Sequence, residues 1–375
     1  MYLTNSAIMR NIIYVYLLAL VSLSFSSCNP TESDIECEKT FELHFGESKN
    51  SPFYLSQMID SILCIELDPS VAIGNIDEAI CCKDTLFLCD KQYGRIYVYN
   101  LDGKNINVFD RKGRASNEYI NIHDFDIDPI TKNIHIYDGA RHSFLVYSKD
   151  GEHLKTIRVS DVIRDFKILE NEEYLIYTPD YNKGSMRGLW KIDSNGRFLE
   201  QLLTISDNFR YGGLYPQYLH RIDDNTIGLM SGEDNDAIYH ITSDTIIGMY
   251  ALDLGTTIPK SLQEEEIIDF EKHKGAVYTK SDYYESKKWM SFSASNFNSN
   301  LMYFYDKVNN KSYCITREEE IIEDVEVYGN FRFSDKNIGI NLLYPYTILS
   351  NPELTKRFPK ITMDSNPILV YVTLK

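Results

Sequence analysis

The sequence predicts an all-β fold, a six-bladed β-propeller of four-stranded antiparallel blades with one short helical insertion. The first observation is a phrase that occurs twice, 48 residues apart: residues 90–103 and 138–151 each hold an Asp, an aromatic strand and an Asp-Gly turn. Short alternating strands bounded by Gly, Asp and Asn then continue along the chain. Finally, β-rich segments at 62–67 and 367–374 could pair to close a ring. A multi-strand repeat of this length is typical of propellers.

Residues 1–27 are predicted to be a lipoprotein signal peptide. Arg10 precedes an apolar run, 12–25, that is shorter than the roughly 20 residues needed to span a bilayer. Ser26, Ser27 and then Cys28 follow, and small residues directly before a cysteine resemble a lipobox. Cys28 is therefore the expected lipidation site, with ordinary signal-peptidase cleavage near Cys28 as the alternative.

The mature chain is predicted to consist of a tether and one domain. Residues 28–50 are mostly polar and acidic at their start, which is typical of a flexible tether, and the propeller is expected at 51–375. We expect the protein in the cell envelope, attached to the outer membrane through its lipid alone, with the side of that membrane left open.

Six units follow one another along the chain. Units one and two match in register, and the later units each show a strand followed by a tight turn. The units are expected at about 74–110, 122–158, 164–204, 218–252 and 288–316, with the least regular one starting near Val327.

One helical passage interrupts the strands. Residues 261–274 have apolar residues along one stripe, and Pro259 stands just before them. The sequence therefore predicts a helical insertion at about 254–288, between units four and five.

Composition excludes some partners. The chain has a formal net charge of −17, which argues against nucleic acid as a partner. Its cysteines show no metal-binding spacing, and most are expected to be small buried hydrophobes on strands. Neutral glycans, peptides, envelope proteins and divalent cations remain compatible with the acidic surface.

Residues 111–119, followed by 124–128, resemble a phrase of the six-bladed β-propeller lipoproteins of Bacteroidetes, which are NHL-like or TolB-like. Gly113, Arg114, Glu118 and Tyr119 match that phrase, whereas Ala115-Ser116-Asn117 replaces its Gly-Pro-Gly turn. The closing residues 366–371 also resemble the family's last strand. The resemblance covers about 51–375 and implies the fold, but it implies little about function.

Unequal loop lengths indicate where a ligand binds. Turns within hairpins are short, whereas the links on the opposite face are long, at 111–121, 179–187, 206–217 and 254–288. The long-loop face is therefore predicted to carry the ligand-binding residues, which are Arg114, Glu118, Tyr119, His123, Asp124, Arg164, Asp165, His220 and Trp289.

Some of these residues also have a structural interpretation. Arg114 and Glu118 could form an ion pair that fixes their own loop. Asp90 and Asp138 are expected to accept hydrogen bonds from loop amides at strand ends.

Three functions are compatible with the sequence, which contains no catalytic motif. The favoured one is a non-enzymatic envelope lipoprotein that binds a glycan, peptide or protein partner on the long-loop face. The second is a metal-assisted enzyme similar to six-bladed lactonases or lyases, with a divalent cation held by Asp124 and Asp165 at the channel mouth. The third is a structural subunit of an envelope complex that docks through the insertion.

Overall fold

The computed structural model describes most of the expected propeller. The predicted signal peptide at 1–27, Cys28 and the predicted helical passage 261–274 lie outside the described residues. No helix in the described part is long and apolar enough to cross a membrane. The described residues are 39–45, 52–178, 187–204, 218–230, 236–255, 276–277, 279–296, 299–316, 319–322, 325–329, 331 and 333–375.

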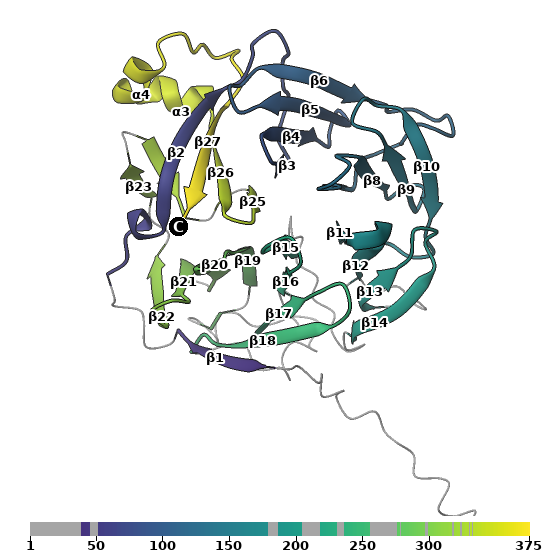
Figure 1. Ribbon diagram of the computed structural model, residues 1–375. Coiled ribbons are helices and arrows are strands. Elements are labelled where there is room, and N and C mark those ends of the chain that lie inside the picture. Colours follow the sequence, from purple (N-terminus) through teal and green to yellow (C-terminus); the bar gives the residue numbers. More distant parts are fainter. Residues whose placement is uncertain are drawn as a thin grey trace, which may run out of the picture. The chain divides into compact units, whose positions relative to one another are not determined.

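Six blades, each built on four antiparallel strands, form a ring, which confirms the predicted fold class (Figure 1). In blades one to five the strands follow chain order from the channel outward. Blade one contains β3 (Glu78–Cys82), β4 (Thr85–Asp90), β5 (Arg95–Asn100) and β6 (Asn105–Asp110), and blade two contains β7 (Asp124–Ile127), β8 (Ile134–Asp138), β9 (Ser143–Tyr147) and β10 (His153–Arg158).

Blades three to five repeat this arrangement. Their strands are β11 (Asp165–Ile168), β12 (Tyr174–Thr178), β13 (Gly188–Ile192) and β14 (Phe198–Thr204); β15 (Leu219–Arg221), β16 (Ile227–Met230), β17 (Ala237–Ile241) and β18 (Ile246–Asp253); and β19 (Thr279–Glu285), β20 (Trp289–Ser295), β21 (Asn300–Asp306) and β22 (Lys311–Thr316).

Blade six joins the two ends of the propeller. Its strands run from the channel outward as β25 (Phe333–Asp335), β26 (Ile338–Leu343), β27 (Ile368–Leu374) and β2 (Ile59–Glu66). Ile62 lies opposite Val372 in the antiparallel β2–β27 pair, so the predicted ring closure is confirmed. Leu369, Val370 and Val372 are fully buried, which explains why this strand is so apolar.

Blade six also carries elements that the sequence did not predict. The helices α3 (Pro345–Ser350) and α4 (Pro352–Arg357) lie between β26 and β27. Asn351 caps α4 by accepting the backbone N–H of Glu353 at 3.0 Å. A separate hairpin, β23 (Glu319–Ile322) and β24 (Val325–Tyr328), precedes β25.

Two strands fall within segments that were expected to be irregular. β1 (Thr40–His44), inside the predicted tether, pairs in parallel with β18 as a fifth strand of blade four. Its apolar Leu43, together with Phe45 just beyond it, is buried between blades four and five, which fixes the strand. β19, inside the predicted insertion, is the inner strand of blade five. It was missed because its buried Lys280 forms an ion pair with Asp236 instead of fitting an apolar alternation.

The repeated phrase forms equivalent hairpins in blades one and two. Asp90 accepts the backbone N–H groups of Asn75 and Tyr93, both at 2.9 Å, and Asp138 likewise accepts that of Ile120 at 2.7 Å. These bonds confirm the predicted role of both aspartates. Gly103, in the first Asp-Gly turn, has a φ of +77°, and a Cβ there would lie 2.0 Å from the carbonyl oxygen of Glu66.

Candidate functional site

The inner strands line the channel. Each has one backbone edge that faces the channel and pairs with no neighbouring strand. Side-chain carboxylates satisfy part of these edges. Asp124 Oδ2 accepts the N–H of Phe166, one blade along, at 3.0 Å. Asp165 Oδ2 accepts the N–H groups of Tyr218 and Leu219, the next blade along, at 2.6 and 2.7 Å. Asp124 and Asp165 therefore connect the starts of consecutive inner strands.

Burial makes these carboxylates costly to ionise. Desolvation, and then the charges of Glu78 and Asp165, hold the pKa of Asp124 well above its usual value. The buried Lys167 ammonium lies 3.4 Å from Asp165 Oδ1. Although burial disfavours its charge, the Asp165 carboxylate keeps the pKa of Lys167 raised. The charges at this end of the channel are thus compensated within the protein.

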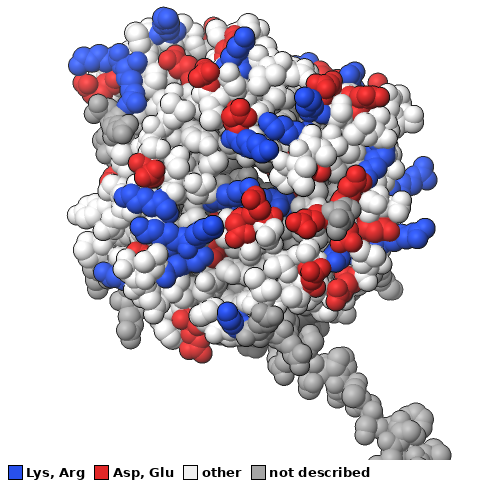
Figure 2. Space-filling view, in the orientation of Figure 1, with Lys and Arg blue, Asp and Glu red and all other residues white. Residues whose placement is uncertain are grey.

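A cavity of about 820 Å³ lies at the other end of the inner strands. It is bounded by the short turns that join first and second strands, and the face shown in Figure 2 is hollowed at its centre, with acidic and basic side chains around the hollow. Its lining includes aliphatic side chains and charges of both signs, which are Ile80, Ile127, Ile130, Ile168, Leu169, Ile227, Lys83, Arg221, Lys336, Asp126, Asp128, Glu170, Glu172, Asp224 and Asp244.

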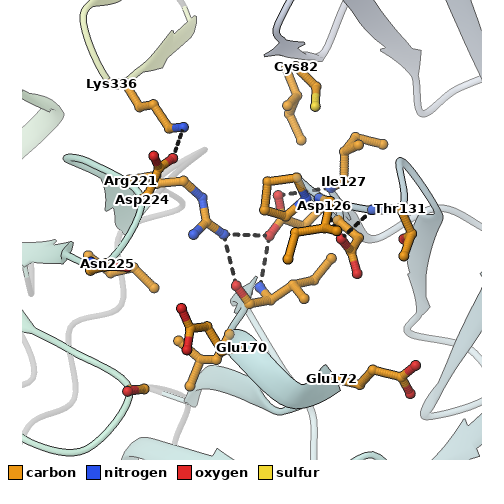
Figure 3. A pocket seen from close by; sticks show the side chains of 18 of the residues that line it. Cys82, Asp126, Ile127, Thr131, Glu170, Glu172, Arg221, Asp224, Asn225 and Lys336 are labelled. Carbon is orange, nitrogen blue, oxygen red and sulfur yellow. Dashed lines mark hydrogen bonds and ion pairs between the residues drawn. The ribbon is translucent and has the colours of Figure 1, made fainter.

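Arg221 connects three blades inside this cavity (Figure 3). Its Nη2 donates to Asp126 Oδ2 of blade two at 3.2 Å and to the carbonyl oxygen of Ile168 of blade three at 3.0 Å. Asp126 Oδ2 also accepts the N–H of Ile168 at 2.8 Å. In the described part of the chain, Nε and Nη1 of Arg221 have no acceptor. Arg221 is therefore held by one nitrogen and can donate from the other two.

The remaining charges of the lining divide by blade. Lys83 stands on the first turn of blade one, and Lys336 on that of blade six. Asp128 and Glu170 stand on the corresponding turns of blades two and three. Lys336 pairs with Asp224 of blade four, whereas Glu170 lies on the opposite side of Arg221 in Figure 3.

An apolar side chain projects at the rim. Ile130 is 82% exposed, at the tip of the β7–β8 turn. Asp128 fixes this turn because its Oδ1 accepts the backbone N–H groups of Ile130 and Thr131 at 2.8 and 2.9 Å. The exposed isoleucine is therefore held in place by the turn.

None of the residues predicted to bind a ligand lines this cavity. Arg114, Glu118 and Tyr119 lie on the crossover from blade one to blade two. Arg114 is exposed, and within the described residues no ion pair joins it to Glu118. Glu118 Oε2 instead accepts the N–H of Ala115 at 2.9 Å, in a space that only a glycine at 113 leaves open.

Tyr119 is fully buried behind that crossover. Its hydroxyl donates to the carbonyl oxygen of Gly94 at 2.7 Å and accepts the N–H of Arg111 at 3.1 Å. Burial raises the pKa of Tyr119. Tyr119 thus fixes the crossover to blade one.

The other predicted residues are distributed among different blades. His123 and Arg164 precede β7 and β11, and both are half-buried. His220 is fully buried, its Nε2 lies 2.9 Å from the carbonyl oxygen of Glu285, and burial lowers its pKa to about 4. Trp289 begins β20 and packs against Phe53 in the core, with ring centroids 5.8 Å apart. Ligand binding by these residues stays a prediction.

The carboxylates expected to hold a cation are already engaged. Asp165 Oδ2 accepts two backbone N–H groups, and both oxygens of Asp124 accept one each. Among the described residues no group of three or more metal-ligating side chains comes together.

Sequence reasoning missed Arg221 and Ile130. Arg221 ends a three-residue strand that no pattern marks, and its partners Asp126 and Ile168 are 95 and 53 residues away. Ile130 carried a signal that could have been used, because an isoleucine inside the short turn 128–133 has no core to enter.

The match to a known family extends over nearly the whole propeller. Residues 39–373 match the domain of unknown function DUF4934. The chain belongs to this family. No curated protein matches the sequence.

Solved structures share the fold of this DUF4934 member. A candidate exported protein of Bacteroides fragilis is 17% identical, with a TM-score of 0.67 over 90% of this chain and 99% of that one. A DUF4221 family member from Bacteroides vulgatus is 10% identical, with a TM-score of 0.52 over 84% and 97% of the two chains. At these identities the likeness shows the fold alone.

Proposed function

We propose that this DUF4934 member is a non-enzymatic lipoprotein of the cell envelope that binds a ligand in the cavity at the short-turn end of its channel. The observation that carries the proposal is the cavity itself. Its volume of about 820 Å³ lies in the range of ligand sites, roughly 300–1,000 Å³, and its lining combines aliphatic side chains with charges of both signs.

The cellular location rests on two observations. The sequence places an apolar run and two small residues before Cys28, and the similar Bacteroides fragilis structure is described as a candidate exported protein. We expect Cys28→Ala to move the protein from the membrane fraction to the soluble fraction, whereas retention in the membrane would refute the lipid anchor.

Binding accounts for the residues better than catalysis does. Asp124 and Asp165, the carboxylates that a metal-assisted reaction would use, are occupied by strand edges. Asp126 and Asp224 in the cavity are likewise paired, with Arg221 at 3.2 Å and Lys336 at 2.5 Å. The insertion proposed as a docking element lies largely outside the described residues.

The proposal is tested with two variants that each remove one charge, one in the cavity and one on the long-loop face. Glycan and peptide arrays are probed with the full chain in detergent, and each hit is titrated against Glu170→Gln in the cavity and Arg114→Gln on the long-loop face. We expect the first variant to weaken binding severalfold and the second to leave it unchanged. The reverse result would place the ligand on the long-loop face and overturn the cavity proposal.

A further inference from the structure

We infer that the ligand of this cavity is a short peptide with free termini, an inference that rests on the proposed function. The lining carries charges of both signs on different blades. Lys83 borders the cavity on blade one, whereas Asp128 and Glu170 border it on blades two and three. A free peptide carries a carboxylate at one end and an ammonium at the other, so its charges match the two sides.

Arg221 places a cation on the floor of the cavity. Two of its nitrogens, Nε and Nη1, have no acceptor in the described part of the protein, and the third is fixed by Asp126 and Ile168. A guanidinium held in this way loses little rotamer freedom when it binds an anion. The peptide carboxylate therefore lies toward Arg221 and Lys83, and its ammonium lies toward Glu170.

The apolar part of the lining supports a peptide over a glycan. Sugar rings pack their C–H faces on aromatic side chains, yet the described lining of the cavity contains no Tyr, Phe or Trp. It contains aliphatic residues instead, and Ile130 at the rim is 82% exposed. An aliphatic side chain of the peptide would bury Ile130 and remove apolar surface from water.

Backbone pairing with the inner strand of blade three is excluded. The N–H groups of Phe166 and Ile168 on the edge of β11 are taken by Asp124 and Asp126, and the carbonyl oxygen of Ile168 is taken by Arg221. A peptide therefore cannot add to this edge as a strand. Recognition has to come from side chains and termini.

The experiment compares three probes on the full chain in detergent. They are a library of short peptides with free termini, the same peptides acetylated and amidated, and a set of neutral oligosaccharides. We expect binding of the free peptides, and a loss of at least tenfold in affinity when both termini are blocked. Equal binding of blocked peptides would overturn the inference about the termini, and tight oligosaccharide binding would overturn the peptide class.

Variants show whether the bound peptide occupies the cavity. Lys83→Asn removes a rim charge and suits the φ of +61° at that position, and Ile130→Ser removes the rim isoleucine. We expect each to weaken peptide binding about two- to fivefold. The matched controls, Lys360→Gln and Val308→Ser, are exposed away from the cavity and should change nothing.

The outcomes separate the inference from the proposed function. An oligosaccharide whose binding falls with Ile130→Ser would overturn the peptide inference and keep the cavity as the site. Peptide binding that neither Ile130→Ser nor Lys83→Asn alters would overturn both. Since both positions are on exposed turns, neither variant is expected to impair folding.

Discussion

The two ends of the channel use the same kinds of residues for different purposes. At the starts of the inner strands, Asp124 and Asp165 are buried, and they accept backbone N–H groups of the next blade. At the ends of those strands, Arg221 keeps two nitrogens without an acceptor in the described chain, and Glu170 is exposed. Both ends connect blades, but only the second keeps Arg221 nitrogens without an acceptor among the described residues.

This difference teaches that charge in a channel does not by itself indicate a site. Asp124 and Asp165 looked attractive as cation ligands because they start inner strands. Their hydrogen bonds instead serve strand edges that no neighbouring strand covers. Side-chain donors and acceptors that have no protein partner after folding indicate a site better than charge does.

The largest expected effect comes from breaking the strand-start end. Asp165→Ala leaves two backbone N–H groups without their acceptor and removes the counter-charge of buried Lys167. We expect the free energy of unfolding to fall by about 3–5 kcal/mol, measured by urea denaturation. Asp165→Asn keeps an acceptor oxygen and should lose less.

The exposed Asp150, in an Asp-Gly turn, provides the control for this prediction. Asp150→Ala is expected to change stability by less than about 0.5 kcal/mol. A loss for Asp165→Ala as small as that of the control would show that the carboxylate does not connect the blades.

The next largest expected effect is a loss of stability when a side chain beside the channel is protonated. Burial lowers the pKa of His220 from 6.5 to about 4, so the unfolded chain binds a proton in this interval and the folded chain does not. Stability should therefore fall as pH falls from 6.5 to 4, by up to about 3 kcal/mol from this residue. His220→Gln should flatten that part of a pH series of urea midpoints.

Glu285 adds a second, more acidic interval. Its burial opposes ionisation, but hydrogen bonds and charges from His240 and Lys307 lower its pKa to about 2. The stability that this carboxylate contributes is complete above pH 4.5 and is lost as pH falls toward 2. Midpoints that do not change from pH 6.5 to pH 2 would contradict both assignments.

The smallest effect concerns the long-loop face. A Cβ at Gly113 would lie 1.9 Å from Glu118 Oε2, so Gly113→Ala should displace the carboxylate that holds Ala115. We expect a loss of about 1–2 kcal/mol and faster proteolytic cleavage within 111–121. Unchanged cleavage would show that the glycine does not fix the crossover.

Sequence patterns sufficed for the parts of the fold that repeat. The phrases at 90–103 and 138–151 predicted the hairpins, and the apolar strand 367–374 predicted ring closure. The same reasoning missed β1 and β19, because one is a short strand fixed by two buried side chains and the other carries buried charge. The alternation of apolar and polar residues along a strand carries no information about contacts with residues distant in the sequence.

The candidate site was less accessible from sequence because it depends on contacts between distant residues. The sequence distinguished the long loop at 111–121 from the short turns of the hairpins. Loop length, however, does not indicate which side chains keep hydrogen-bond donors without a protein acceptor. Arg221 acquires its role only when blades two and three place Asp126 and Ile168 beside it. Such a contact follows from the closed ring and not from any local motif.

The pairing of β2 with β27 has a consequence for the order of folding. Ile59 pairs with Leu374, so almost the whole propeller lies between the two strands that close it. Contacts of this sequence separation form slowly, because a long loop must be closed before they give any stability. Until β27 is available, the apolar β2 edge stays open to other chains.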